Sequence, residues 1–317
     1  MLRKLPAAMV IAALLLAIPG IWALVSTGDD APPTIALTPA VDGVRSADAR
    51  AAFWQDRIAG PTDWLNRVHA GAAQLEAARQ SGDPADYEAA LAFADAALLA
   101  NPTSDDARTL RAATLSSAHR FDEALTEART VLASDANAFQ AHAVAGDALL
   151  ELGRYDEADN HLDALVRLQP QAPAVLSRLA EFAWDTDDTT GALSYGEQAL
   201  LRANEAGLSS GELSFYAIRL ARFRLDTGDL TGAADLAAEA LRIAPEVPAV
   251  HSTVGFVRLA EGRSAEAIDA FEAAVAITPL REALVELVTL HETNGDVDAL
   301  AEAASLLEAL GPAPEVG

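Results

Sequence analysis

One stretch of the chain decides its fold: residues 139–170 read FQAHAVAGDALLELGRYDEADNHLDALVRLQP. Gly153 stands where a turn is needed, and Pro170 closes the stretch. Glycine accommodates the left-handed conformation that ends many helices, and proline cannot continue a helix. The stretch therefore predicts two antiparallel helices that are joined by a tight turn and closed by a proline.

The same pattern recurs along the chain at regular intervals. Its clearest marker is a set of evenly spaced alanines, which we call the alanine series: Ala90, Ala124, Ala158, Ala192, Ala233, Ala267 and Ala301. The spacing is constant except for a longer step between Ala192 and Ala233. Alanine is abundant here, but prolines keep the same register further along four of the repeats, at Pro102, Pro170, Pro245 and Pro279. A period of about 34 residues is that of two antiparallel helices and their turns. We therefore predict an all-α fold of about seven stacked helix pairs.

These residues resemble the tetratricopeptide repeat family, whose pattern has a small residue early in the first helix, a turn glycine, close-packed alanines and a closing proline. Residues 139–170 form one good copy and residues 248–279 another. Ala136 and Asn204 replace the closing proline, and a seven-residue insertion surrounds Gly207. The resemblance covers about residues 71–310. It implies a right-handed superhelical solenoid in which the first helix of each repeat lines a concave binding groove.

The N-terminus predicts a membrane segment. Arg3 and Lys4 precede an uncharged run of 21 residues, 5–25, which is close to the length that crosses a bilayer core of about 30 Å. We predict four parts of the chain: a signal anchor or signal peptide at 1–25, a flexible linker at 26–46, a helical cap or half repeat at 47–70, and a repeat solenoid at 71–317. The repeats are predicted to start near residues 71, 105, 139, 173, 214, 248 and 282.

The charges around this segment predict its orientation. Positive charge stays on the cytoplasmic side of a membrane, so we expect the repeats to lie in the periplasm or outside the cell. The best cleavage sites, ending at Ala23 or Val25, are poor small-x-small matches. We therefore favour an uncleaved membrane anchor, with secretion after signal cleavage as the alternative.

Composition excludes several functions. The net charge of -25 repels phosphate backbones, so we expect no nucleic-acid partner. The chain has no cysteine, and Lys4 is its single lysine, which excludes P-loop, Schiff-base and Ser-Lys chemistry. No HExxH zinc motif occurs. We expect no cofactor, no metal and no enzymatic activity.

The predicted binding site lies on the groove-facing positions of repeats four to six. Aromatic and arginine side chains, which are enriched at interaction hot spots, gather there with one acid: Arg178, Glu181, Trp184, Phe215, Arg219, Arg222 and Phe256. Such a cluster suits an extended acidic or aromatic-containing segment. Two simpler interpretations stay open, because Arg222 could pair with Asp226 at helical spacing and Trp184 or Phe256 could pack as core.

We therefore predict a non-catalytic protein–protein interaction scaffold or assembly factor of the cell envelope. Its partners are other proteins or peptide segments, together with the membrane through the anchor, and no small-molecule cofactor. The alternative is an envelope hydrolase. It would use carboxylates that share a helix face, Asp147 with Glu151 and Glu181 with Asp185.

Overall fold

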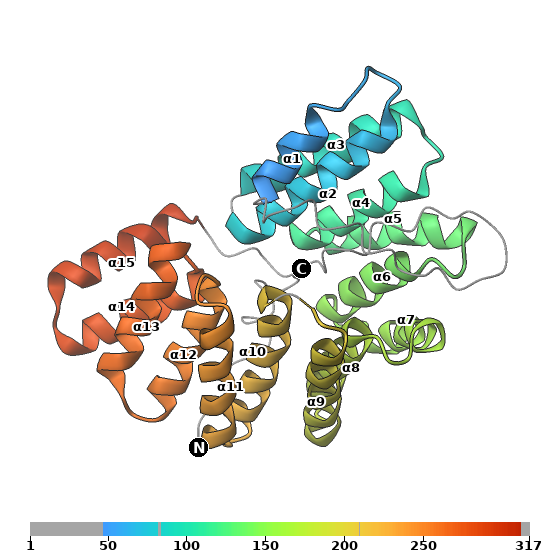
Figure 1. The fold of residues 1–317 in the computed structure, drawn as a ribbon. Helices are drawn as coiled ribbons and strands as arrows, with labels where there is room; N and C mark the ends of the chain where they lie inside the picture. Colours follow the sequence, from blue (N-terminus) through green and yellow to red (C-terminus); the bar gives the residue numbers. More distant parts are fainter. Residues whose placement is uncertain (1–46, 82–83, 209, 312–317) are drawn as a thin grey trace. The chain divides into compact units, whose positions relative to one another are not determined.

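The computed structural model describes residues 47–81, 84–208 and 210–311. All the regular structure of these residues is α-helical, in fifteen helices arranged as a tetratricopeptide-like repeat array (Figure 1). The predicted anchor, 1–25, and linker, 26–46, lie outside them. Among the described helices, none combines the length and the apolar character that a membrane crossing requires. The division of the chain into anchor, linker, cap and solenoid stays a prediction.

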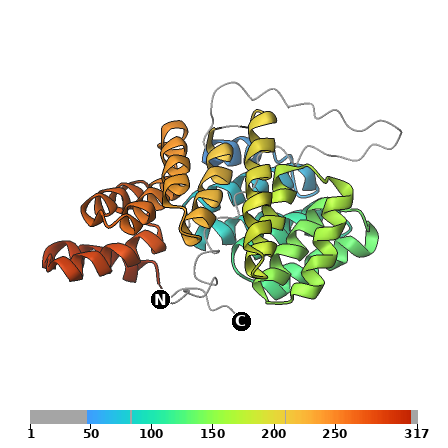
Figure 2. The ribbon, with the colours of Figure 1, turned by 90° about the horizontal axis from the view of Figure 1, so that it is seen from below.

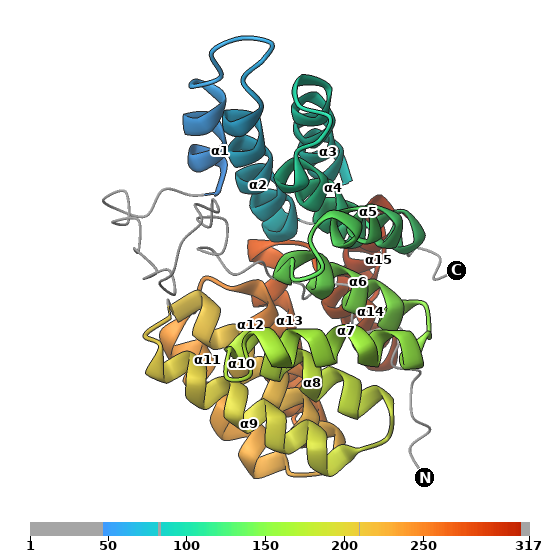
Figure 3. The ribbon, with the colours of Figure 1, turned by 90° about the vertical axis from the view of Figure 1, so that its right-hand side faces the viewer.

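The described residues fall into two compact units, which meet in sequence between Leu168 and Gln169. The helices of the first unit are α1 (Ala47–Gln55), α2 (Trp64–Ser81), α3 (Pro84–Ala100), α4 (Asp105–Ser117), α5 (Phe121–Ser134), α6 (Phe139–Glu151) and α7 (Tyr155–Leu168). Each helix packs on the next one, and α4 also contacts α2 and α6. Figure 3 shows α1, α2 and α3 side by side. Because α4 contacts both α2 and α6, the first helices of successive repeats form a common layer in this unit.

The second unit repeats this arrangement. Its helices are α8 (Pro173–Asp185), α9 (Thr189–Glu205), α10 (Ser210–Asp226), α11 (Leu230–Ile243), α12 (Pro248–Ala260), α13 (Ser264–Ile277), α14 (Arg281–Asn294) and α15 (Val297–Ala309). Consecutive helices pack on each other, and α12 also contacts α10 and α14. Figure 2 shows α12 to α15, in orange to red, following one another. Here too the first helices of the repeats share one layer.

The turns inside the repeats use left-handed backbone. Gly153, Gly228 and Gly262 have φ values of 68°, 86° and 76°, which glycine adopts without steric cost. His119 and Asp187 occupy the same place in repeats that lack the glycine, and they take nearly the same conformation, with φ values of 59° and 63°. The turn is therefore set by the packing of the two helices, and glycine only makes it easier.

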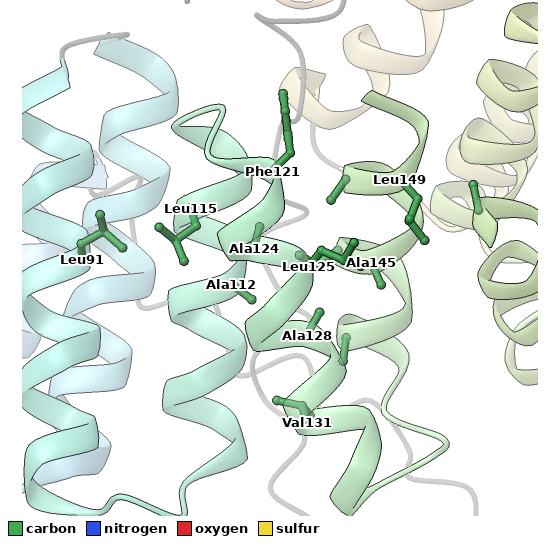
Figure 4. Packing of buried hydrophobic residues seen from close by; sticks show 14 residues of the cluster. Leu91, Ala112, Leu115, Phe121, Ala124, Leu125, Ala128, Val131, Ala145 and Leu149 are labelled. Atoms are coloured by element: carbon green, nitrogen blue, oxygen red, sulfur yellow. The ribbon is translucent and has the colours of Figure 1, made fainter. Parts of the chain in front are cut away.

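The alanine series lies in the core, at the contacts between helices. Six of its members, from Ala90 to Ala267, are completely buried, and Ala301 is exposed on α15, which no described helix follows. Figure 4 shows Ala124 between helices of the first unit, in a cluster with Leu115 and Phe121. Small side chains let neighbouring helices approach closely, so the series marks the contacts that stack the repeats.

Two glycines at equivalent positions should respond oppositely to the same substitution. A methyl group at Gly255 would lie 2.5 Å from Cε1 of the fully buried Phe271, whereas one at Gly146 would meet only Cβ of His161 at 3.6 Å. We expect Gly255→Ala to lower the free energy of unfolding by about 1–3 kcal/mol through overpacking. We expect Gly146→Ala to raise it by about 0.5–1 kcal/mol, because alanine restricts the unfolded chain and favours helix.

Urea denaturation followed by circular dichroism measures both changes. Equal effects of the two substitutions would contradict this account of the packing.

Candidate protein-binding face

The candidate site is the layer of first helices in the second unit, α8, α10, α12 and α14, which we call the inner face. All seven residues predicted from the sequence lie on it. Arg178, Glu181 and Trp184 are on α8, Phe215, Arg219 and Arg222 are on α10, and Phe256 is on α12. On each helix the spacings of three, four or seven residues keep most of these side chains on one side.

An ion pair joins α8 to α10 on this face. The guanidinium of Arg219 binds the carboxylate of Glu181, and the two side chains are only 14% and 18% exposed. The same guanidinium lies 5.2 Å from the ring centroid of Phe215, one turn earlier on α10. Arg219 is therefore held in place by groups of its own chain.

A second ion pair reaches from α10 over α12 to α14. Nη2 of Arg222 donates to Oε2 of Glu282 at 2.8 Å, and the hydroxyl of Ser252 donates to Oε1 at 2.7 Å. The guanidinium also lies 4.5 Å from the ring centroid of Phe256. The Arg222–Asp226 ion pair considered from the sequence is wrong, because the partner is Glu282. The helical spacing that pointed to Asp226 says nothing about a carboxylate sixty residues away.

The three rings of the face are half-buried, and each packs on a buried ring behind it. Trp184 lies 5.0 Å from Phe223. The other two pairs are edge-on at 5.1 Å: Phe215 with Tyr216, and Phe256 with Phe271. The two interpretations left open for the rings, groove or core, both apply in part. One part of each ring supports the fold, and the rest stays accessible.

Three carboxylates of the face have raised pKa values because their surroundings disfavour charge. Burial raises the pKa of Asp185 to about 6. Burial also raises the pKa of Asp226, partly offset by Arg222, and the pKa of Glu286, to which the charge of Glu282 adds. None of the three forms an ion pair within the described part of the chain. Glu286 was missed in the sequence, where one acid on an acidic helix gives no signal.

One property of this face is compatible with the hydrolase alternative. A carboxyl with a pKa near 6 meets one requirement of a general acid or base. Burial alone causes the shift of Asp185, however, whereas paired catalytic carboxylates act on each other across the scissile bond. Glu181, one turn away, is engaged by Arg219. Among the described residues, no group of three or more His, Cys, Asp or Glu side chains could hold a metal.

Comparison with known families supports the repeat assignment. Residues 144–207 match the family model described as Tetratricopeptide repeat. Residues 83–165 match the model described as Anaphase-promoting complex, cyclosome, subunit 3. No curated protein matches the chain significantly.

Solved structures share the fold at low sequence identity. A chain of the APC/C hetero-tetramer Cut9–Hcn1 is 16% identical with a TM-score of 0.60; the match covers 84% of this chain and 46% of that one. PilF of Pseudomonas aeruginosa is 19% identical with a TM-score of 0.50, over 66% of this chain and 92% of that one. PilW is 15% identical with a TM-score of 0.53, over 67% and 96%. This chain thus spans less than half the length of the Cut9–Hcn1 chain.

The fold and these matches define the class: the chain is a tetratricopeptide repeat protein. Such repeats stack into extended binding surfaces and act as protein–protein interaction scaffolds. Scaffold families of this kind are typically non-catalytic. The similarity to PilF and PilW, at such low sequence identity, concerns the fold alone.

The raised pKa of Asp185 predicts how one substitution changes stability with pH. Its folded-state pKa of about 6 exceeds the usual value of 3.8, so the ionised group costs stability. This cost is complete above about pH 6 and disappears as the pH falls below about 4. We expect Asp185→Asn to raise the free energy of unfolding by about 1 kcal/mol at pH 7.5, a figure reduced for solvent screening of the half-exposed group. The gain should shrink as the pH is lowered.

Denaturant titrations between pH 7.5 and 4.5 measure this difference. Asp269→Asn, on the exposed side of α13, should leave stability near the wild-type value at pH 7.5. A stabilisation by Asp185→Asn that stays constant over this range would contradict the assignment.

Proposed function

We propose that the chain is a non-catalytic scaffold or assembly factor of the cell envelope that holds a protein segment on its inner face. The observation that carries the proposal is the set of half-buried rings, each backed by a buried ring and accompanied on the same face by arginines. Accessible aromatic side chains contribute much of the binding energy at protein interfaces, and the paired arginines beside them hold the rings in place. The proposed contact residues are those predicted from the sequence: Arg178, Glu181, Trp184, Phe215, Arg219, Arg222 and Phe256.

The ion pairs of the face favour binding by reducing its entropic cost. Arg219 and Arg222 connect helices of different repeats and lie beside Phe215 and Phe256. The rings are thereby held in place before a partner arrives, so less side-chain freedom is lost on association. A preorganised surface of this kind suits a scaffold that receives a flexible segment.

The envelope location rests on the N-terminal sequence and on the type of neighbour. Arg3 and Lys4 precede the uncharged run 5–25, and PilW, which shares the fold, is described as a type IV pilus biogenesis factor. We place the repeats outside the cytoplasm behind an uncleaved anchor, with secretion after cleavage as the alternative. Assembly of an envelope structure is the role that this location supports.

The location predicts protease sensitivity. When the outer layers of intact cells are permeabilised, added protease should degrade the repeats, because they lie beyond the inner membrane. Immunoblotting with an antibody against the repeats measures this. Full protection until the inner membrane is lysed would place the repeats in the cytoplasm.

The binding face predicts a pattern of crosslinking in cells. A photo-crosslinking amino acid at Phe215 on α10, or at the half-buried Leu259 on α12, should yield discrete adducts with a partner protein. The same group at Asp235 or Asp269, which are exposed on second helices, should not. Mass spectrometry identifies the adducts. Equal yields of the same adduct at both sets of positions would show that the partner uses another surface.

A further inference from the structure

The arginines of the inner face already have partners within the chain. Arg178 donates to the carbonyl of Ala174 at 3.1 Å, Arg219 binds Glu181, and Arg222 binds Glu282. The last two pairs are more than four-fifths buried. Breaking such a pair leaves a buried charge without compensation, which costs about 3–5 kcal/mol. An acidic segment would have to displace these carboxylates, so the arginines do not favour the acidic partner predicted from the sequence.

A row of unpaired carboxylates lies one helical turn beyond these ion pairs. Asp185 follows Glu181, Asp226 follows Arg222, and Glu286 follows Glu282, each by four residues on its own helix. Since α8, α10 and α14 all belong to the layer of first helices, the three carboxylates share the inner face. Within the described residues, none of them is paired with a basic side chain.

The helix ends add to the negative potential of this row. Asp185 is the last residue of α8, and Asp226 is the last residue of α10. The carboxyl end of a helix carries partial negative charge, so it is stabilised by cations. Acids at these two positions therefore repel the helix dipole and favour an incoming positive charge.

Some buried polar atoms on these helices have no hydrogen-bond partner among the described residues; they include acceptors and also a donor, Nε of Arg222. Oδ1 of Asp185 has no hydrogen-bond partner among the described residues. The same holds for the hydroxyl of Tyr216, a residue that is only 3% exposed and on which the charges of Arg178 and Glu212 act. Both atoms can accept a hydrogen bond, and leaving such a group unsatisfied is unfavourable. Oδ1 of Asp185 can therefore accept a hydrogen bond from a partner.

The rings of the face accept guanidinium groups. Arg219 lies over Phe215 and Arg222 over Phe256, at 5.2 Å and 4.5 Å from the ring centroids. Trp184, next to Asp185 at the end of α8, has no guanidinium over it among the described residues. Tryptophan gives the strongest interaction of this kind. The end of α8 thus offers a ring and a carboxylate to a cation from outside.

We propose that the segment bound on the inner face is basic, an extended stretch with arginine or lysine side chains. Its cations bind the carboxylates of Asp185, Asp226 and Glu286, and its apolar atoms pack on Trp184, Phe215 and Phe256. The inference rests on the proposed function, and it names the chemistry of the partner. The net charge of -25 steers such a segment toward the protein.

Binding of two matched peptides to the full-length chain in detergent tests the proposal. One is a fluorescein-labelled peptide that alternates arginine with leucine, and the other has glutamate in place of every arginine. Fluorescence anisotropy should show binding of the basic peptide, weakened by added salt. The proposal is overturned if the acidic peptide binds as well or better.

A pair of triple variants separates the row from the general acidity of the chain. Asp185→Asn/Asp226→Asn/Glu286→Gln removes the row, and Asp235→Asn/Asp269→Asn/Glu302→Gln removes three exposed carboxylates from second helices. Both change the net charge equally. We expect the first variant to weaken the basic peptide about tenfold and the second less than about twofold. Equal weakening would show that only overall charge attracts the peptide, which overturns the proposal.

The crosslinking experiment keeps the two claims apart. If Phe215 and Leu259 still yield adducts with a cellular partner while the basic peptide does not discriminate between the variants, the scaffold function stands and the basic chemistry is wrong. Circular dichroism of both triple variants checks that the helices remain folded.

Discussion

The close approach of helices at small side chains is the constraint on which the rest of this structure depends. Neither helix of a repeat can bury its apolar surface alone, so each must pack on its neighbours. The buried members of the alanine series and Gly255, which faces the ring of Phe271, permit that contact. Larger side chains would separate the helices, and the inner face would lose the spacing on which its side-chain pairs depend.

That spacing makes ion pairs possible between helices that are not neighbours in sequence. Arg219 reaches Glu181 on the helix pair before it, and Arg222 passes Ser252 to reach Glu282. In a partly buried setting these pairs contribute more to the uniqueness of the arrangement than to its net stability, because desolvation offsets much of their attraction. They also change what the face can bind, since a cation engaged within the chain is not offered to a partner.

The carboxylates at the ends of α8 and α10 show the opposite case. Asp185 and Asp226 lie where both burial and the helix dipole disfavour negative charge. Positions of this kind are unfavourable for the isolated fold, and they gain most when a cation arrives. The same face therefore combines arginines that are ion-paired within the chain with acids that have no basic partner among the described residues, and we infer that this difference sets its preference for partners.

Much of the fold could be predicted from the sequence because its signals are local. The alanine spacing, the turn glycines and the closing prolines act within one helix pair, so they indicated helical repeats and placed Arg178, Glu181, Trp184, Phe215, Arg219, Arg222 and Phe256 on first helices. The left-handed turns at His119 and Asp187 had no such signal, because packing imposes them without glycine. The sequence by itself thus determined the repeat, its register and the residue types on the inner face.

Only the tertiary structure decided which of these residues are already paired with another residue of the chain. The carboxylate that binds Arg222 is sixty residues away, and the burial that raises the pKa of Asp185 comes from helices packed around it. Pairing and desolvation depend on distances between repeats, and a periodic sequence carries no record of those distances.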